Sequence, residues 1–378
     1  MSHIATRILF LAIMLICTFF AFRSQRITII NGDDVVAKFH KPYLFLSCII
    51  AWFFLAFTNI GVDYNSYYMI AYRSNWDTYN NIISVEPGFA ILCTTIKNIV
   101  GNNPDAVIFF LKTIQIGLAF LSIYILREKI DVGYAVLAYM TLVYLPSFYL
   151  LSIVLAGSIV FVAIALVIKR EKYIFPLLLI LLAAQLHNAV YLFVPAYLAI
   201  WVLNRNKNLS RLYRYLILIA YIIISFSSSQ IFGYFQNIIS GFHYGNYKLT
   251  TISGSGLMVI IMYLPLVCIV YLLSKYNIDT DTMNEIFIFA ITSFLFNILS
   301  YQFRVIERME LVLAPLYMLL FPKTLYSSGI IIRDGRTQSK TLVYVVYILY
   351  LAFRAYLVFT SRTTVQSGMS QYNFFMPF

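Results

Sequence analysis

The sequence predicts an all-α, polytopic membrane protein, and three observations support this fold class. First, 61% of the 378 residues are hydrophobic and only 11% are charged, whereas a soluble domain carries about 25% charged residues. Second, apolar runs of about 15 residues or more recur along the whole chain. Third, most of the basic residues behind the net charge of +12 lie in loops between these runs, which is typical of membrane orientation rather than nucleic-acid binding. We therefore predict a single transmembrane domain over residues 1–378.

Apolar windows predict about twelve transmembrane helices. The segment "EPGFAILCTTIKNIVG" (86–101) is too short and too polar to cross, so we expect a re-entrant or interfacial helix there. The predicted spans lie near 8–22, 43–60, 106–126, 132–148, 152–168, 173–186, 190–203, 215–229, 257–274, 284–302, 311–322 and 341–359.

Basic residues predict the orientation of these spans. They gather in alternate loops, near 23–41, 127–129, 169–172, 205–214, 275 and 323–340, which the positive-inside rule places in the cytoplasm. Both termini are then outside, together with an outer loop at 61–105 and a second one at 230–256. The cytoplasmic loops are short and contain no nucleotide-binding motif, so we expect the chemistry at the outer face.

The first outer loop begins with "NIGVDYNSYY", which places Asp63 among Tyr64, Tyr67 and Tyr68, and Glu86 follows in the same loop. An aromatic belt at headgroup depth is one interpretation. The alternative, which we prefer, is a sugar-binding surface, because aromatic faces stack on sugar C–H groups while carboxylates accept hydroxyl hydrogens.

The stretch "FRVIER" (303–308) places Arg304 and Arg308 on one helical face at the outer end of a span. Salt bridges to Glu307 and Glu310 would explain this pair. We favour a diphosphate at the membrane surface, because planar guanidinium groups match phosphate oxygens.

Two further outer segments are candidates for the site. His187 lies in a tight outer turn and is either a structural residue or a base. The loop 230–256 is long and aromatic, which favours a lid that binds the acceptor sugar through Tyr244 and Tyr247.

"NIGVDYNSYY", "EPGF", "LHNAVYLFVPAY" and "RMELVLAPLYMLLFP", in this order, resemble the EpsG/Wzy family of polysaccharide polymerases, over residues 59–322. The resemblance implies a polytopic helical enzyme of the bacterial cytoplasmic membrane. It would use undecaprenyl-diphosphate-linked oligosaccharide as donor and acceptor, with membrane lipids and a chain-length regulator protein as partners. It marks Asp63, Tyr64, Glu86 with Gly88, His187 and Arg308. Relatives often have an Arg within the stretch matching 150–161, which this chain lacks, so Arg73 and Lys248 are candidates to supply that charge.

The expected reaction is transfer of a glycan from its lipid diphosphate to a sugar hydroxyl, without nucleotide, metal or other cofactor. Arg304, Arg308 and Arg73 would bind the diphosphate, and Asp63, Glu86 or His187 would accept the proton of the hydroxyl. An O-antigen-type ligase, a flippase for lipid-linked oligosaccharides and a membrane acyltransferase are the alternatives. The ligase shares nearly every feature of the sequence.

Overall fold

In the computed structural model, helices form most of the described chain. The structure describes residues 3–30, 34–61, 63–74, 86–169 and 174–194, with residues 197, 198, 212, 216, 345, 346, 348–356, 374, 376 and 377. The predicted spans 257–274, 284–302 and 311–322 lie outside these residues, and in the span 215–229 only residue 216 is described.

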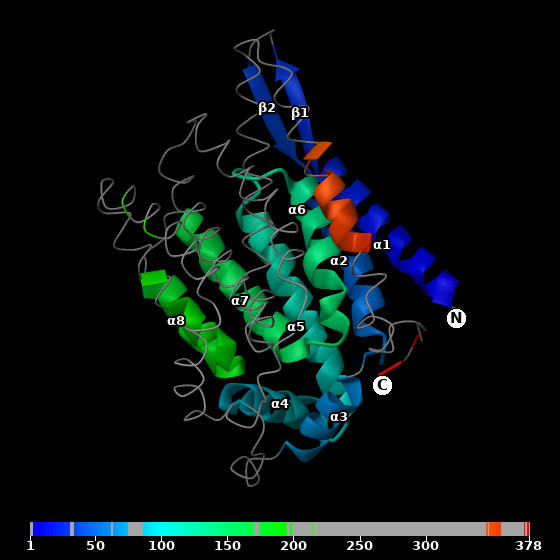
Figure 1. The fold of residues 1–378 in the computed structure, drawn as a ribbon, viewed down its shortest axis with the longest axis vertical. Coiled ribbons are helices and arrows are strands. Elements are labelled where there is room, and N and C mark those ends of the chain that lie inside the picture. Colours follow the sequence, from blue (N-terminus) through cyan, green and yellow to red (C-terminus); the bar gives the residue numbers. More distant parts are fainter. Residues whose placement is uncertain are drawn as a thin grey trace.

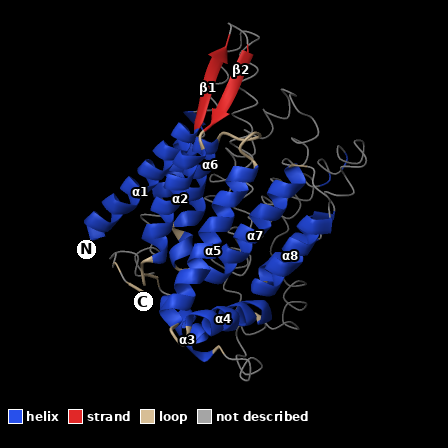
Figure 2. Ribbon diagram, turned by 180° about the vertical axis from the view of Figure 1, so that it is seen from behind, coloured by secondary structure: helices blue, strands red, loops and turns tan. Residues whose placement is uncertain are grey.

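The long helices form a bundle whose axes run roughly parallel (Figure 1). Helix α5 packs against α2 and α7, α7 packs against α8, and α1 packs against α2 and α6. Figure 2 shows the same arrangement from behind. The helices are α1 (His3–Ser24), α2 (Lys41–Ala56), α5 (Pro104–Ile125), α6 (Val132–Tyr139), α7 (Leu151–Ile168) and α8 (Ile174–Leu186).

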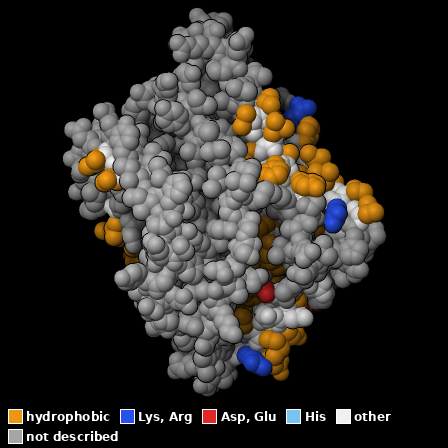
Figure 3. Space-filling model, in the orientation of Figure 1, with side chains coloured by type: hydrophobic (Ala, Val, Ile, Leu, Met, Phe, Trp, Pro, Cys, Tyr) orange, Lys and Arg blue, Asp and Glu red, His pale blue; other side chains and the backbone are white. Residues whose placement is uncertain are grey.

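Three of these helices are long and apolar enough to cross a membrane: Ile4–Ser24, Pro104–Ile125 and Leu151–Ile168. Large apolar side chains of α1 are exposed, and Figure 3 shows hydrophobic side chains over much of the described surface on that face. Such a surface is suited to contact with lipid tails rather than water. The prediction of a helical membrane protein is therefore confirmed.

Local sequence signals explain where the bundle helices begin. The Asn103 side chain accepts hydrogen bonds from the backbone N–H groups of Asp105 and Ala106, and Pro104 occupies the first helical position of α5. Asp131 caps α6 in the same way. These side chains satisfy N–H groups that have no partner inside the helix.

The predicted span 132–148 is not one regular helix. Helix α6 passes into the π-helix η2 (Met140–Tyr144), and the 3-10 helix η3 (Pro146–Phe148) follows. Pro146 has no N–H group and its ring clashes with the preceding turn, so an α-helix cannot continue through it. The helical period was predicted correctly here, but its interruption was missed.

A β-hairpin is the main departure from the all-α prediction. Strands β1 (Gln25–Ile30) and β2 (Asp34–Phe39) pair antiparallel, with Gln25 opposite Phe39. We expected only a basic loop here. The signal was present, because β-branched residues flank the turn sequence "NGD" at 31–33, and Asn-Gly is a strong hairpin signal.

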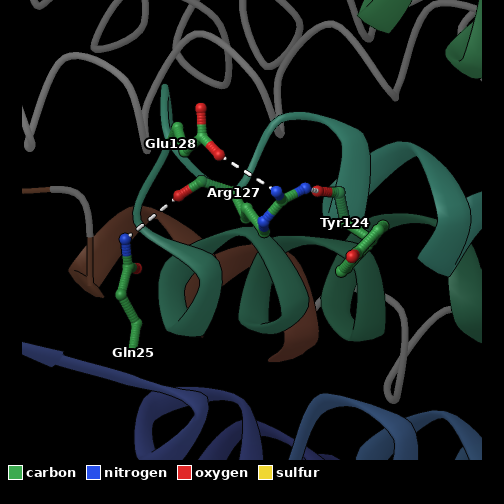
Figure 4. A network of polar contacts seen from close by, with 4 residues as sticks. All are labelled: Gln25, Tyr124, Arg127 and Glu128. Atoms are coloured by element: carbon green, nitrogen blue, oxygen red, sulfur yellow. Dashed lines mark hydrogen bonds and ion pairs between the residues drawn. The ribbon is translucent and has the colours of Figure 1, made fainter. Parts of the chain in front are cut away.

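The hairpin projects from one end of the bundle, which we call the hairpin end (Figures 1 and 2). The Gln25 side chain connects the hairpin to the loop between α5 and α6 through a hydrogen bond, as Figure 4 shows. Its amide donates to the carbonyl of Arg127 at 3.2 Å. The Arg127 guanidinium lies 4.4 Å from the centre of the Tyr124 ring and pairs with Glu128 at 3.0 Å. This end carries the first two loops predicted to be cytoplasmic.

Two short helices lie across the opposite end of the bundle, which we call the α3–α4 end (Figures 1 and 2). They are α3 (Tyr64–Arg73) and α4 (Pro87–Val100). Helix α4 contacts α3, α5 and α8. It lies across the end of the bundle and does not pass through it (Figures 1 and 2). The segment predicted as a re-entrant or interfacial helix, 86–101, forms this helix.

Candidate functional site

An acid–histidine pair lies at the α3–α4 end. Oε1 of Glu86 is 2.8 Å from Nδ1 of His187, although the two residues are 101 positions apart in the sequence. Both side chains are shielded from solvent, and His187 is only 7% exposed. Two of the three predicted catalytic residues therefore touch each other.

The "EPG" sequence explains the position of Glu86. Glu86 has an extended backbone just before α4, and Pro87 occupies the first helical position, where its missing N–H costs nothing. At Gly88, an added Cβ would lie 2.6 Å from Cβ and 2.7 Å from the carbonyl oxygen of Gln185. Only glycine permits this approach between the start of α4 and the end of α8.

His187 is held at the end of α8 by its backbone. Its N–H donates to the carbonyl of Ala183 at 3.1 Å, and its carbonyl accepts from Val190 at 3.0 Å. The 3-10 helix η4 (Asn188–Leu192) follows directly. The backbone of His187 is thus hydrogen-bonded on both sides, and its ring contacts Glu86. Here the predicted span 190–203 begins with a 3-10 turn.

Electrostatics keep Glu86 ionised. Burial alone would raise its pKa, but the hydrogen bond and charge of His187, together with backbone donors of Glu86 and Asn188, outweigh burial and lower it. An ionised carboxylate 2.8 Å from a ring nitrogen attracts positive charge on that ring. The pair can therefore stabilise a positive charge that arises on His187.

The lowered pKa of Glu86 predicts a pH-dependent stability. The unfolded carboxyl, with its ordinary pKa of 4.5, binds a proton more readily than the folded one, so folding is favoured above that pH. We expect the melting-temperature difference between the wild type and Glu86→Gln to be constant from neutral pH to about pH 5. It should shrink as the pH falls further. Thermal unfolding in detergent at several pH values measures this difference in melting temperature. A difference that stays constant down to about pH 3 would contradict a stabilising contact between ionised Glu86 and His187.

Tyr67 links three elements beside the acid–histidine pair. Its hydroxyl lies 3.3 Å from Oγ of Ser152 and accepts from the Ser152 N–H at 3.3 Å. Its ring meets Phe89 edge-on at 5.8 Å. Burial raises the Tyr67 pKa, and the nearby carboxylates of Asp63 and Glu86 raise it further, against the lowering effect of Ser152. Tyr67 therefore keeps its proton and acts as a hydroxyl, and both carboxylates lie close enough to influence it.

Asp63 precedes α3 in a turn that Gly61 makes possible. Gly61 has a φ of +124°, and a Cβ there would lie 2.6 Å from the carbonyl oxygen of Phe148. The carbonyl of Asp63 accepts from the Tyr67 N–H at 2.9 Å, which starts the helix. Asp63 itself is half-buried. "NIGVDY" thus contains a glycine whose backbone lies close to Phe148 of η3, two residues before the acid.

The tyrosines predicted to bind sugar have different surroundings. Tyr64 is buried and its hydroxyl donates to Asp105, so its ring belongs to the core of this end. Tyr67 and Tyr68 are half-buried, and both pack against the core. Arg73 is exposed at the last turn of α3. Tyr244, Tyr247, Arg304 and Arg308 lie outside the described residues.

Several residues that form this end were not singled out from the sequence. Ser152, Asp105 and Gln185 carry no motif, and only their contacts identify them. Lys112 was missed as well, although a lysine inside a predicted span is a signal that the sequence contains. Among the residues that the structure describes, no group of three His, Cys, Asp or Glu side chains is placed to hold a metal ion.

The fold and this cluster define a polytopic helical membrane protein with a polar, shielded site at one end of its bundle. The family model of the EpsG family matches residues 41–374, so the chain belongs to the EpsG family. The resemblance found in the sequence is thereby confirmed. This family is associated with polymerase-type glycosyl transfer in polysaccharide biosynthesis. Searches against curated proteins and against solved structures return no match.

Proposed function

We propose that this protein is a polysaccharide polymerase of the bacterial cytoplasmic membrane, with its active site at the α3–α4 end facing outward. It would transfer a growing glycan from undecaprenyl diphosphate to a sugar hydroxyl of an incoming lipid-linked repeat unit. The observation that carries the proposal is the Glu86–His187 contact of 2.8 Å. Family membership supplies the reaction class.

The pair has the arrangement of an oriented general base. When Nδ1 of His187 donates to Glu86, Nε2 carries the lone pair, and the carboxylate stabilises the imidazolium formed by proton uptake. Glu86 is suited to this role because its lowered pKa keeps it ionised. We therefore assign His187 as the base, Glu86 as its orienting partner and Asp63 as a group that binds the acceptor sugar.

The proposed reaction balances without a nucleotide. The acceptor oxygen gives its proton to Nε2 of His187 and forms a bond to C1 of the donor sugar. The bond between C1 and the diphosphate oxygen breaks, and its electron pair leaves with undecaprenyl diphosphate. Tyr67 lies near the carboxylates of Asp63 and Glu86. Tyr67 and Tyr68 would contact the sugars, while Tyr244 and Tyr247 would cover the acceptor. Positioning two membrane-bound substrates would supply much of the acceleration.

Arg304 and Arg308 would bind the leaving diphosphate, with Arg73 as a further cation at this end. We expect Arg308→Ala to lower turnover by about 10²- to 10³-fold, because a donor aimed at the developing charge is lost. The matched control is Arg336→Ala, in a loop predicted to be cytoplasmic. Equal activity of the two variants would show that Arg308 does not bind the diphosphate.

A reconstituted transfer assay tests the function directly. Purified protein in vesicles would receive the undecaprenyl-diphosphate-linked repeat unit extracted from a host strain that lacks the polymerase. The proposal expects a ladder of products without added nucleotide, lost in Asp63→Ala. A unit that crosses the bilayer unchanged would indicate a flippase. Transfer of a single finished glycan to another acceptor would indicate a ligase, and acyl transfer would indicate an acyltransferase.

A further inference from the structure

A buried lysine lies beside the proposed site without belonging to it. Lys112 is 1% exposed in the membrane-crossing helix α5. An ionisable side chain inside a membrane helix is costly to bury, so its contacts need an explanation.

Among the residues that the structure describes, the polar and ring contacts of Lys112 lead to the α2–α3 connection. Its ammonium donates to the carbonyl of Thr58 at 2.8 Å and lies 5.5 Å from the centre of the Tyr64 ring. The Tyr64 hydroxyl donates to Asp105, which is seven residues before Lys112 on α5. Residues seven apart lie on the same face of a helix, so Tyr64 spans from an anion to a cation on one face of α5.

The C-terminal tail contacts both sides of this arrangement. Phe374 forms a backbone bridge with Thr58, and its ring stacks on Phe57 at 5.9 Å. The Asn103 side chain donates to the carbonyl of Pro377 at 2.9 Å while it caps the helix that carries Asp105. The network of Lys112, Tyr64 and Asp105 is therefore enclosed between α5 and the tail.

We propose that Lys112 is a positioning residue that fixes the α2–α3 turn and, through it, Asp63 and Tyr67. The turn at 61–63 lies between Thr58 and Tyr64, and Lys112 contacts both of these residues. Tyr67 follows one turn later in α3, where it contacts Ser152 and lies near Glu86. Lys112 thus acts on the reaction through the acid and the tyrosine and does not touch substrate. This inference rests on the proposed function.

Lys112→Met removes the charge but keeps a long apolar side chain. An apolar residue in place of a buried charge often leaves stability unchanged or higher, so we expect this variant to fold. In the vesicle assay its kcat should fall by about 10- to 100-fold, because a small misplacement of reacting groups is costly, while KM stays within about two-fold. Lys112→Arg should recover part of the activity. Lys129→Met, an exposed lysine at the hairpin end, is the matched control and should behave as the wild type.

Hydrogen exchange of the backbone amides tests the same inference independently of the transfer assay. Amides of α3 should exchange faster in Lys112→Met and in Tyr64→Leu, and remain closer to wild type in Tyr64→Phe, which keeps the ring. Amides of α7 should not change. Wild-type kcat in Lys112→Met, or unchanged α3 exchange, would overturn the positioning role. If wild type makes no product but α3 loosens as expected, the proposed polymerase function fails while the positioning network stands.

Discussion

Replacing His187 with alanine is expected to lower the turnover of glycan transfer by about 10²- to 10⁴-fold, the usual contribution of a general base. The physical reason is the loss of the imidazole whose Nδ1 lies 2.8 Å from Oε1 of Glu86 and whose Nε2 would accept the proton of the hydroxyl. Substrate binding should change little, because the imidazole acts on one hydroxyl proton. Initial rates over a range of lipid-linked repeat-unit concentrations separate kcat from KM.

The variant Glu86→Gln tests whether His187 acts as a base oriented by Glu86 or as an isolated histidine. Glu86→Gln keeps a hydrogen-bonding side chain 2.8 Å from the ring but loses the charge that stabilises the imidazolium. We expect the turnover of Glu86→Gln to lie between those of the wild type and His187→Ala. The double variant should be no slower than His187→Ala, because the two residues act as a unit.

The control for histidine loss is His40→Ala, at the hairpin end before α2. It should retain wild-type turnover. Normal turnover in His187→Ala would show that another group accepts the proton, and Asp63 would be the next candidate because it lies near Tyr67.

The sequence allowed us to predict which segments share an end of the bundle, but not which side chains touch. Alternating basic loops placed Glu86 and His187 on one side. Their contact depends on the close approach of Gly88 to Gln185, and no periodicity or charge pattern encodes a distance between two helices. The pairing therefore required the three-dimensional arrangement.

The stretch beginning at Asp63 shows a different limit. We read its tyrosines as a solvent-facing rim, and the structure forms a short helix in which Asn65 and Ser66 are exposed while Tyr64 is buried. Helical spacing of Tyr64, Tyr67 and Tyr68 was available in the sequence. This spacing predicts that the three rings share one helical face, whereas the tyrosine-rich composition alone suggests an open surface.

Replacing Gly88 with alanine is expected to damage both stability and activity. A Cβ there would lie 2.6 Å from Cβ and 2.7 Å from the carbonyl oxygen of Gln185, and backbone cannot move aside as a flexible side chain can. Overpacking of this kind costs about 1–3 kcal/mol. The start of α4 must shift away from α8, which separates Glu86 from His187, and we expect transfer to fall by about 10- to 100-fold.

Gly117→Ala is the matched control, because Gly117 lies in α5 and no atom of the described residues lies within 4 Å of an added Cβ. Alanine in an open helical position should be neutral or stabilising by up to about 1 kcal/mol. Thermal unfolding and the vesicle assay compare the two variants. If Gly88→Ala lost stability but kept full transfer, the contact between α4 and α8 would be structural only, and the acid–histidine pair could not be the centre of the reaction.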